Sequence, residues 1–250
     1  MSTNTALVYY RNKIIHSKDL CQHAVNEFIG TCGTDLSSHK INNVLIPDYF
    51  SVKQPGHMSF PLTTIYPGLL IGTGYTHPKI EKEDFQFGFY FDHTTGMPVI
   101  PGSTVKGVLK SIFPKEKEKD EIKAEKMKYI HEKIGNNVNQ TILKTNWQEI
   151  FFERKQVFLD AYISDLPRDR KIFAEDYICP HTAGVFREPN PIRFLKIAPG
   201  VTFTFQFVLH DYSVNGKTII SAENIMEIFK QIIIDFGIGA KRNVGYGAMV

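Results

Sequence analysis

The chain has 250 residues with a formal net charge of +3 at pH 7, and 42% of its residues are hydrophobic. This length and composition are ordinary for a globular protein with one large domain or two small ones, whereas the weak charge excludes a uniformly basic nucleic-acid-binding protein. Three cysteines, Cys21, Cys32 and Cys179, form an odd set without C-x-x-C spacing, which argues against a disulfide framework or a structural zinc site.

Residues 1–60 are predicted to form a mainly helical extension. Apolar residues recur at helical spacing over 19–29, residues 30–40 are rich in turn formers, and Pro47 interrupts the apolar run at 42–50. This extension could dock on a neighbouring subunit or cover the core of its own domain, and the sequence leaves both open.

Two strands are predicted after the extension. Residues 61–71 form the first, and the glycine-rich turn 72–77 follows it. The second spans 85–91, where alternation places four phenylalanines on one face: Phe85, Phe87, Phe89 and Phe91. Such a face could stack RNA bases, but four phenylalanines on one strand face are more typical of a core.

A capped helix is predicted over residues 103–113. Ser103 or Thr104 is a natural N-cap, and apolar residues then recur at helical spacing. Lys106 and Lys110 lie four residues apart and therefore share one face of the helix. This face is either simply solvated or a cationic surface for an anion.

Residues 115–152 are predicted to be an insertion in the domain. The first part, 115–133, interleaves lysine with acidic residues so that the charges nearly cancel, as in an exposed helix or a flexible segment. Residues 141–152 are predicted to form a short helix that contains the only tryptophan, Trp147.

The rest of the chain alternates strands and helices. We predict strands over 156–163, 172–179, 190–199 and 201–210, a tight turn at Asn215–Gly216 and a helix over 222–236. The order of strand, helix, strands, helix, glycine loop and final strand predicts an α+β fold with a split βαβ core of the ferredoxin-like or RRM-like type. We expect residues 1–250 to form a single domain.

A glycine-rich stretch, residues 235–250, ends the sequence. Four glycines surround two adjacent cations, Lys241 and Arg242: Gly237, Gly239, Gly245 and Gly247. Glycines let backbone N–H groups approach a ligand closely, and the two cations make an anion the expected ligand. Alternatively, the stretch is only a helix C-cap followed by a turn into a strand.

Three motifs in this chain resemble the RAMP superfamily of CRISPR RNA-binding proteins, and they occur in that family's order. They are Pro-Val-Ile-Pro-Gly-Ser-Thr-Val-Lys-Gly-Val-Leu-Lys at 98–110, Gly-Ile-Gly-Ala-Lys-Arg-Asn-Val-Gly-Tyr-Gly at 237–247, and the strand with its glycine turn at 65–77. The stretch at 87–103, which runs into the first motif, is similar to the sixth-subunit group of the type III-B (Cmr) effector complexes. The resemblance covers roughly residues 60–113 and 155–250.

The resemblance implies that the helix at 103–113 and the glycine-rich stretch lie beside each other and contact the guide RNA. Glycine N–H groups, a helix N-terminus and a few cations suffice to hold an RNA backbone without reading its bases. The residues carried over to RNA binding are Ser103, Lys106, Lys110, Gly237, Gly239, Lys241, Arg242, Gly245, Tyr246 and Gly247.

The implied function is antiviral defence by a non-catalytic subunit that caps the backbone filament of a type III-B complex near the 3′ end of the guide. Its implied partners are CRISPR guide RNA, target RNA reached through the complex, and the other Cmr subunits. No cofactor or metal is expected. Cys179-Pro-His181 offers only two ligand types without further partners, which is a weak metal signal.

An endoribonuclease is the alternative, because some members of the superfamily cleave RNA. The candidate catalytic residues are Asp35, His77, Asp92, His93 and His181, but no two of them have a spacing that indicates general acid–base work on a 2′-OH. We therefore expect no catalysis. A phosphate-loop hydrolase is disfavoured, because the glycine-rich stretch lacks G-x-x-x-x-G-K-[ST] and follows a helix.

The sequence also predicts where the protein works. No basic-then-apolar leader begins it, and no apolar run approaches the ~18 residues that a membrane span needs. Together with the unpaired cysteines, this predicts a cytoplasmic protein without a membrane partner.

Overall fold

The computed structural model describes residues 55–72, 86–92, 96–134, 140–153, 155–169, 171–178 and 192–250. These residues form a mixed α/β structure with four α-helices and three β-sheets. The predicted extension lies outside the described residues as far as residue 54, and so do Asp35, His77, His93 and the Cys179-Pro-His181 segment.

The largest sheet has β9 near its centre. Its strand order is β1 (His57–Thr63), β9 (Thr202–Val208), β6 (Ala161–Asp165), β4 (Pro98–Ile100) and β3 (Tyr90–Phe91), with β5 (Val157–Phe158) also paired to β9. All of these pairs are antiparallel. Phe203, Phe205 and Phe207 of β9 are fully buried, as expected for a strand at the core.

Two smaller sheets flank the main one. The first has the order β2 (Gln86–Phe87), β8 (Ile192–Ile197) and β7 (Phe173–Ile178). The second is a hairpin of β10 (Tyr212–Val214) and β11 (Lys217–Ile220). Asn215 and Gly216 join these two strands with φ values of 50° and 76°, which confirms the predicted turn.

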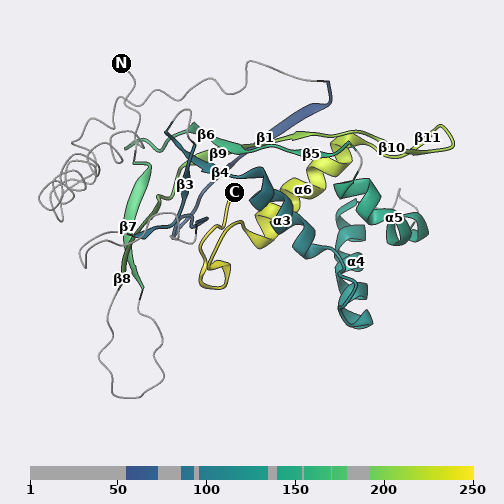
Figure 1. Ribbon diagram of the computed structural model, residues 1–250, viewed down its shortest axis with the longest axis horizontal. Coiled ribbons are helices and arrows are strands. Elements are labelled where there is room, and N and C mark those ends of the chain that lie inside the picture. Colours follow the sequence, from purple (N-terminus) through teal and green to yellow (C-terminus); the bar gives the residue numbers. More distant parts are fainter. Residues whose placement is uncertain are drawn as a thin grey trace, which may run out of the picture.

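Four helices accompany the sheets: α3 (Gly102–Ile112), α4 (Asp120–Ile134), α5 (Gln140–Phe152) and α6 (Ala222–Phe236). In Figure 1, α3 and α6 lie beside the main sheet, with α4 and α5 beyond them at one end. None of the helices among the described residues combines the length and apolarity that crossing a membrane requires.

Helix α6 forms where the sequence predicted it. Ser221 is its N-cap and accepts a hydrogen bond from Asn224 N, and Gly237 ends it with φ of 69°. Its apolar face is fully buried: Ile225, Ile228, Phe229, Ile232 and Ile233. The ring of Phe229 lies 5.5 Å from that of Phe207, so α6 packs directly on β9.

Three predicted strands are shorter than expected. The strand at 61–71 begins at His57 and ends at Thr63, because Pro67 and Gly68 then form a turn. The strand at 85–91 splits into β2 and β3, which pair with different sheets. The strand at 156–163 splits into β5 and β6. Alternation in a sequence shows which residues share a face, but not which strand will pair with them.

The phenylalanines at 85–91 are nevertheless core residues where their side chains are described. Phe89 and Phe91 are buried, and their ring centroids lie 5.3 Å apart in an edge-to-face contact. Phe89 also stacks on Phe173 of β7 at 4.9 Å. These two rings are therefore enclosed by protein, which favours the core interpretation over base stacking.

Helix α3 begins one residue earlier than predicted, and neither Ser103 nor Thr104 is its N-cap. Pro101 is at the N-cap, where no side chain caps the helix. The Gly102 N–H instead donates to Asp160 Oδ1 at 2.7 Å, so a distant carboxylate satisfies the helix start. Only the tertiary structure could supply this partner.

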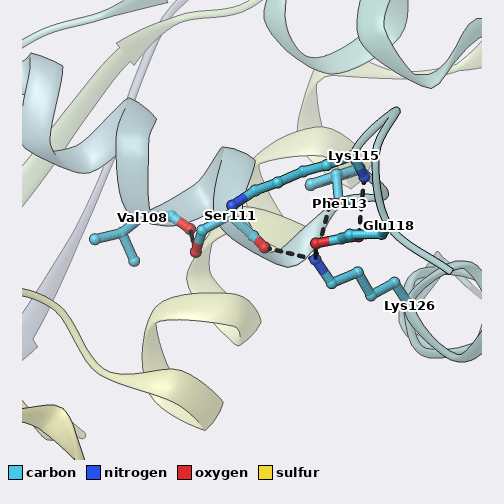
Figure 2. Close-up of polar contacts among 6 residues, drawn as sticks. All are labelled: Val108, Ser111, Phe113, Lys115, Glu118 and Lys126. Carbon is cyan, nitrogen blue, oxygen red and sulfur yellow. Dashed lines mark hydrogen bonds and ion pairs between the residues drawn. The ribbon is translucent and has the colours of Figure 1, made fainter. Parts of the chain in front are cut away.

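The charged segment after α3 is an ordered helix rather than a flexible insertion. Met127 and Ile130 of α4 are buried in the core. Figure 2 shows how Lys126 of α4 holds the end of α3: its Nζ donates to Ser111 O at 3.0 Å, Phe113 O at 3.3 Å and Glu118 Oε1 at 2.7 Å. A lysine thereby satisfies carbonyls that the helix end would leave without partners.

Gly107 on α3 has no packing reason to be glycine within the described fold. It is exposed in the helix interior, and a Cβ built on it would have no heavy atom within 4 Å. We expect Gly107→Ala to raise the free energy of unfolding by about 1 kcal/mol, because alanine has the higher helix propensity. Denaturant unfolding of the full chain measures this.

Gly102→Ala is the matched control on the same helix. A Cβ on Gly102 would lie 2.3 Å from Phe158 O, so this variant should be destabilised while Gly107→Ala is stabilised. A destabilised Gly107→Ala would mean that the exposed face of α3 is in fact packed against another part of the protein.

Candidate nucleic-acid interface

The glycine loop, defined here as residues 237–248, follows α6 and folds back on itself. The Gly237 N–H donates to Ile233 O at 2.8 Å, which closes the helix. The Ile238 N–H donates to Gly247 O at 2.9 Å, so the two ends of the loop are joined. Between them lies a short 3-10 helix, η3 (Arg242–Val244). Figure 1 shows this loop next to the C-terminus, projecting beyond the end of α6.

The glycine loop rests on the turn formed by residues 65–70, called the Tyr66 turn below. Three backbone hydrogen bonds join them: Ile65 N to Ala248 O at 3.1 Å, Gly247 N to Gly68 O at 2.8 Å and Ala240 N to Leu70 O at 2.7 Å. Thr64 and Met249 add an antiparallel bridge beside them. Two of the three sequence motifs, far apart in the chain, therefore form one rigid unit.

Two glycines make this close packing possible. Gly239 has φ of 93°, and a Cβ on it would lie 2.1 Å from Leu70 O. Gly247 has φ of 78°, and a Cβ there would lie 1.8 Å from Ile238 O. Both positions need a residue that tolerates a positive φ and has no side chain. These glycines serve the contact between backbone segments within the protein.

The glycine N–H groups are mostly engaged inside the fold. Besides Gly237 and Gly247, Gly245 donates its N–H, to Arg242 O at 3.0 Å. This differs from the expectation that these N–H groups would face an anion, and it matches the alternative of a helix cap followed by a turn. What the loop can offer to a ligand is therefore its side chains.

The two cations of the loop differ in their surroundings. Lys241 is exposed and has a left-handed backbone conformation with φ of 57°. Arg242 is half-buried, and one of its guanidinium nitrogens donates to Phe236 O at 3.4 Å, at the C-terminal end of α6. A guanidinium has five N–H donors, so this contact leaves others for an anion.

Tyr246 points into the protein and anchors the loop. Its side chain is buried with Leu70 and Phe194, and its hydroxyl donates to Asp176 Oδ2. The same carboxylate oxygen accepts from Lys196 Nζ, which lies 5.3 Å from the centroid of the Tyr246 ring. Asp176 lies on β7 and Lys196, only 6% exposed, lies on β8, so this Lys196–Asp176–Tyr246 cluster ties both strands to the glycine loop.

The cluster shifts the pKa of two of its members. Burial raises the pKa of Tyr246, and the hydrogen bond to Asp176 and its negative charge raise it further. Burial alone would raise the pKa of Asp176, but the hydrogen bonds from Lys196, Tyr246 and the Tyr177 backbone hold it below its usual value. Asp176 is thus a charged acceptor and Tyr246 a neutral donor at pH 7.

A second polar cluster supports the helix from which the loop emerges. Asp235, at the end of α6, pairs with Lys133 of α4 at 2.6 Å and accepts a hydrogen bond from Tyr129 at 2.8 Å. The ring of Tyr129 contacts Phe236 at 5.1 Å between centroids. The predicted insertion therefore contributes to the position of the glycine loop.

The residues predicted on α3 are oriented in different directions. Ser103 and Lys110 are exposed. Lys106 instead turns toward the core: its Nζ donates to Phe152 O at 3.2 Å and lies 5.3 Å from the centroid of Phe158. It caps the end of α5 and is therefore less available to a ligand than Lys110. Helix α3 contacts α6, which connects it to the glycine loop.

Sequence reasoning missed three residues of this region. Tyr66 is 83% exposed on the turn that carries the glycine loop. Lys196 and Asp176 lie in the predicted strands at 190–199 and 172–179, and neither was assigned a role in the site from the sequence. The one clue for Tyr66 was its place in a Tyr-Pro-Gly sequence, which is typical of a turn.

Comparison with known proteins agrees with the motifs. A family model described as the RAMP superfamily matches residues 61–250. A curated protein, CRISPR system CMR subunit Cmr6 of Saccharolobus solfataricus, is 30% identical over 176 residues, which are 67% of this chain and 50% of that protein.

Two solved structures are also similar. A chain in the cryo-EM structure of the type III-B Cmr-beta complex bound to cognate target RNA matches with a TM-score of 0.50 and 27% identity, over 77% of this chain and 57% of that one. Cmr6 from Pyrococcus furiosus matches with a TM-score of 0.47 and 20% identity, over 80% of this chain and 99% of that one.

This chain spans about half the length of the curated relative and 57% of the chain in the Cmr-beta complex. The family model, however, covers the α3 motif, the Tyr66 turn and the glycine loop together. The resemblance to Cmr proteins that the three motifs predicted is confirmed, and the chain belongs to the RAMP superfamily.

Proposed function

We propose that this protein is a non-catalytic, guide-RNA-binding subunit of a type III-B CRISPR interference complex, where it caps the filament near the 3′ end of the guide. Its partners are the guide RNA, the neighbouring Cmr subunits and, through the complex, the target RNA. Membership of the RAMP superfamily and the similarity to a chain of an RNA-bound type III-B complex support this proposal.

One observation carries the binding role. The glycine loop is anchored by backbone hydrogen bonds to the Tyr66 turn and by Tyr246, yet it presents Lys241 to solvent and Arg242 beside it. Because the backbone of Lys241 is already fixed by the loop, only its side chain loses freedom when it meets a phosphate. We therefore expect Lys241 and Arg242 to contact the RNA, and the glycines to act only by fixing the backbone that carries these two cations.

Exposed residues of α3 extend the same role. Lys110 adds a third cation, and Ser103 adds a hydroxyl near the helix start. The Gly102 N–H at the start of α3 already donates to Asp160, so the positive end of the helix dipole is partly neutralised within the protein. We therefore assign phosphate contacts chiefly to Lys241, Arg242 and Lys110. Such contacts do not depend on the identity of the bases.

The experiment is a salt titration of single-stranded RNA binding by the chain co-purified with its neighbouring subunits. The double variant Lys241→Ala, Arg242→Ala should bind more weakly to all sequences. It should also reduce the slope of log K against log salt by about 0.7 for each phosphate that it no longer neutralises.

The control variant removes the same charge elsewhere. Lys155→Ala with Lys217→Ala deletes two exposed lysines, and Lys217 lies on the β10–β11 hairpin, away from the glycine loop in Figure 1. This control should keep the wild-type slope. An unchanged slope in the Lys241→Ala, Arg242→Ala variant would remove the glycine loop from RNA binding.

The proposed absence of catalysis is checked in the same incubations. Of the five candidate catalytic residues, only Asp92 lies among the described residues, in the turn before β4 that its backbone N–H closes to Met97 O. Gel analysis should show intact RNA at the end of each titration. Cleavage that His77→Ala or Asp35→Ala stops would favour the endoribonuclease instead.

We also propose that the centre of the main sheet is the split βαβ core of the ferredoxin-like type. The strand pairings are in keeping with it: Met249 bridges to the end of β1, β1 pairs with β9, and β9 pairs with β6, all antiparallel. Helix α3 follows β1 in the chain and α6 follows β9, which is the alternation that this core requires.

A further inference from the structure

Tyr66 is the most exposed large hydrophobic side chain among the described residues, with 83% of its surface in contact with solvent. The turn that carries it is held by three backbone hydrogen bonds to the glycine loop. Ordering a mobile segment on binding would cost conformational entropy. The backbone that carries Tyr66 is already fixed, so a ligand that contacts the ring avoids most of this cost. The fold itself gains little from the ring, since so little of it is buried.

The turn that carries the ring lies against the glycine loop near its cations. A Cβ built on Gly245 would lie 3.3 Å from Pro67 Cδ, so the residue after Tyr66 touches the loop just past η3. Lys241, at the N-cap of η3, and Val244, the last residue of η3, are both exposed, and Val244 is 67% exposed.

We propose that Tyr66 is a stacking platform for one base of the single-stranded RNA whose backbone the glycine loop holds. The inference rests on the proposed function and adds a base contact to it. Tyrosine stacks on any base because every base has a π-face, so the contact would not depend on sequence. The exposed Val244 would pack against the edge of the same base or its sugar.

The charge of this surface favours RNA over a protein partner. Neither the Tyr66 turn nor the glycine loop contains an aspartate or glutamate, while the loop contains Lys241 and Arg242. The nearby carboxylate of Asp176 is paired with Lys196. A single strand of RNA offers a flat base and a phosphate within one nucleotide, and an aromatic ring with adjacent cations matches both.

The test uses the full chain co-purified with its neighbouring subunits and a single-stranded oligoribonucleotide with 2-aminopurine at successive positions. Tyr66→Ala should weaken binding about tenfold, within the range measured for base–aromatic stacking. The salt slope should stay at the wild-type value, because the variant still neutralises the same phosphates. One 2-aminopurine position should be quenched by the wild type and not by Tyr66→Ala.

Tyr66→Phe is the matched control, because it keeps the ring and removes only the hydroxyl. It should bind and quench within about twofold of the wild type. Both variants should melt at the wild-type temperature, since the side chain is exposed. Loss of binding with a lowered melting temperature would instead indicate a structural role for Tyr66 and overturn the proposal.

The outcomes separate this inference from the proposed function. Wild-type affinity in Tyr66→Ala with a reduced salt slope in Lys241→Ala, Arg242→Ala would overturn stacking alone. Wild-type behaviour of both variants would overturn the proposed function and the stacking contact together. If Tyr66→Ala released the neighbouring subunits while RNA affinity was kept, the ring would be a protein-docking surface and the proposal would be wrong.

Discussion

Gly247→Ala is expected to lower the free energy of unfolding by about 2–4 kcal/mol and to remove the contribution of the glycine loop to the salt slope of RNA binding. The added Cβ would lie 1.8 Å from Ile238 O, and φ at this position is 78°. The variant therefore combines a left-handed backbone conformation, costing about 1–2 kcal/mol, with overpacking against a carbonyl that costs about as much again. Denaturant unfolding measures the first effect.

Gly216→Ala separates the two contributions. Gly216 has nearly the same φ, 76°, but a Cβ on it would have no heavy atom within 4 Å. It should therefore cost only the conformational part, about 1–2 kcal/mol. Equal destabilisation by the two variants would show that close packing of the glycine loop adds nothing to stability.

The functional consequence of Gly247→Ala follows from what the glycine does. It leaves Lys241 and Arg242 in the sequence but forces apart the two ends of the glycine loop, where Ile238 N donates to Gly247 O. If the variant remains folded but its slope of log K against log salt falls to that of Lys241→Ala, Arg242→Ala, the position of the cations matters and not only their charge. Salt titration of the folded fraction gives this result.

Asp176→Ala is expected to lower the free energy of unfolding by about 2–4 kcal/mol. It leaves Lys196, which is 6% exposed, as a buried charge without its partner. Breaking a buried pair from one side typically costs about 3–5 kcal/mol, and the partial exposure of Asp176 reduces this range. The substitution also removes the acceptor of the Tyr246 hydroxyl.

Tyr246→Phe is the control for that hydroxyl. It keeps the ring that packs on Leu70 and Phe194 and removes only the donor to Asp176. It should cost about 1 kcal/mol, the usual net value of one hydrogen bond. If Tyr246→Phe were as destabilising as Asp176→Ala, the hydroxyl rather than the buried lysine would dominate the cluster.

The effect of Asp176→Ala should depend on pH. The pKa of Asp176 is lowered in the folded protein, so its stabilisation is fully present above the unfolded pKa of about 4 and is lost as the pH falls through the folded pKa. Wild type and variant should therefore differ most at pH 6–8 and converge in acid. A difference that stayed constant down to pH 3 would contradict the charged role of Asp176.

Local signals in the sequence were sufficient for the helices and for the family. Apolar spacing from Ile225 to Ile233 determined the buried face of α6, and Ser221 and Gly237 supplied its two caps. These signals work because a helix is stabilised by residues only a few positions apart. The same holds for the Asn215–Gly216 turn and for the motifs that identified the superfamily.

Contacts between distant residues decided what the sequence could not. The strand at 85–91 split because its two halves pair with different sheets, and α3 begins at a carboxylate 58 residues away, that of Asp160. Lys106 and Lys110 look alike in the sequence, yet one caps α5 and the other is exposed. Spacing along a helix gives a shared face, but not what the rest of the chain places against it.

The glycine loop shows where that division lies. The sequence alone determined that residues 237–247 need an unusual backbone and carry two cations, because glycine and lysine have those properties wherever they occur. Only the tertiary structure decided that the N–H groups of Gly237, Gly245 and Gly247 bind the chain's own carbonyls, that Tyr246 turns inward to Asp176 and that Tyr66 turns outward. Each of these depends on desolvation and pairing between segments far apart in the chain, as between Gly68 and Gly247, and such partners are set by the folded packing.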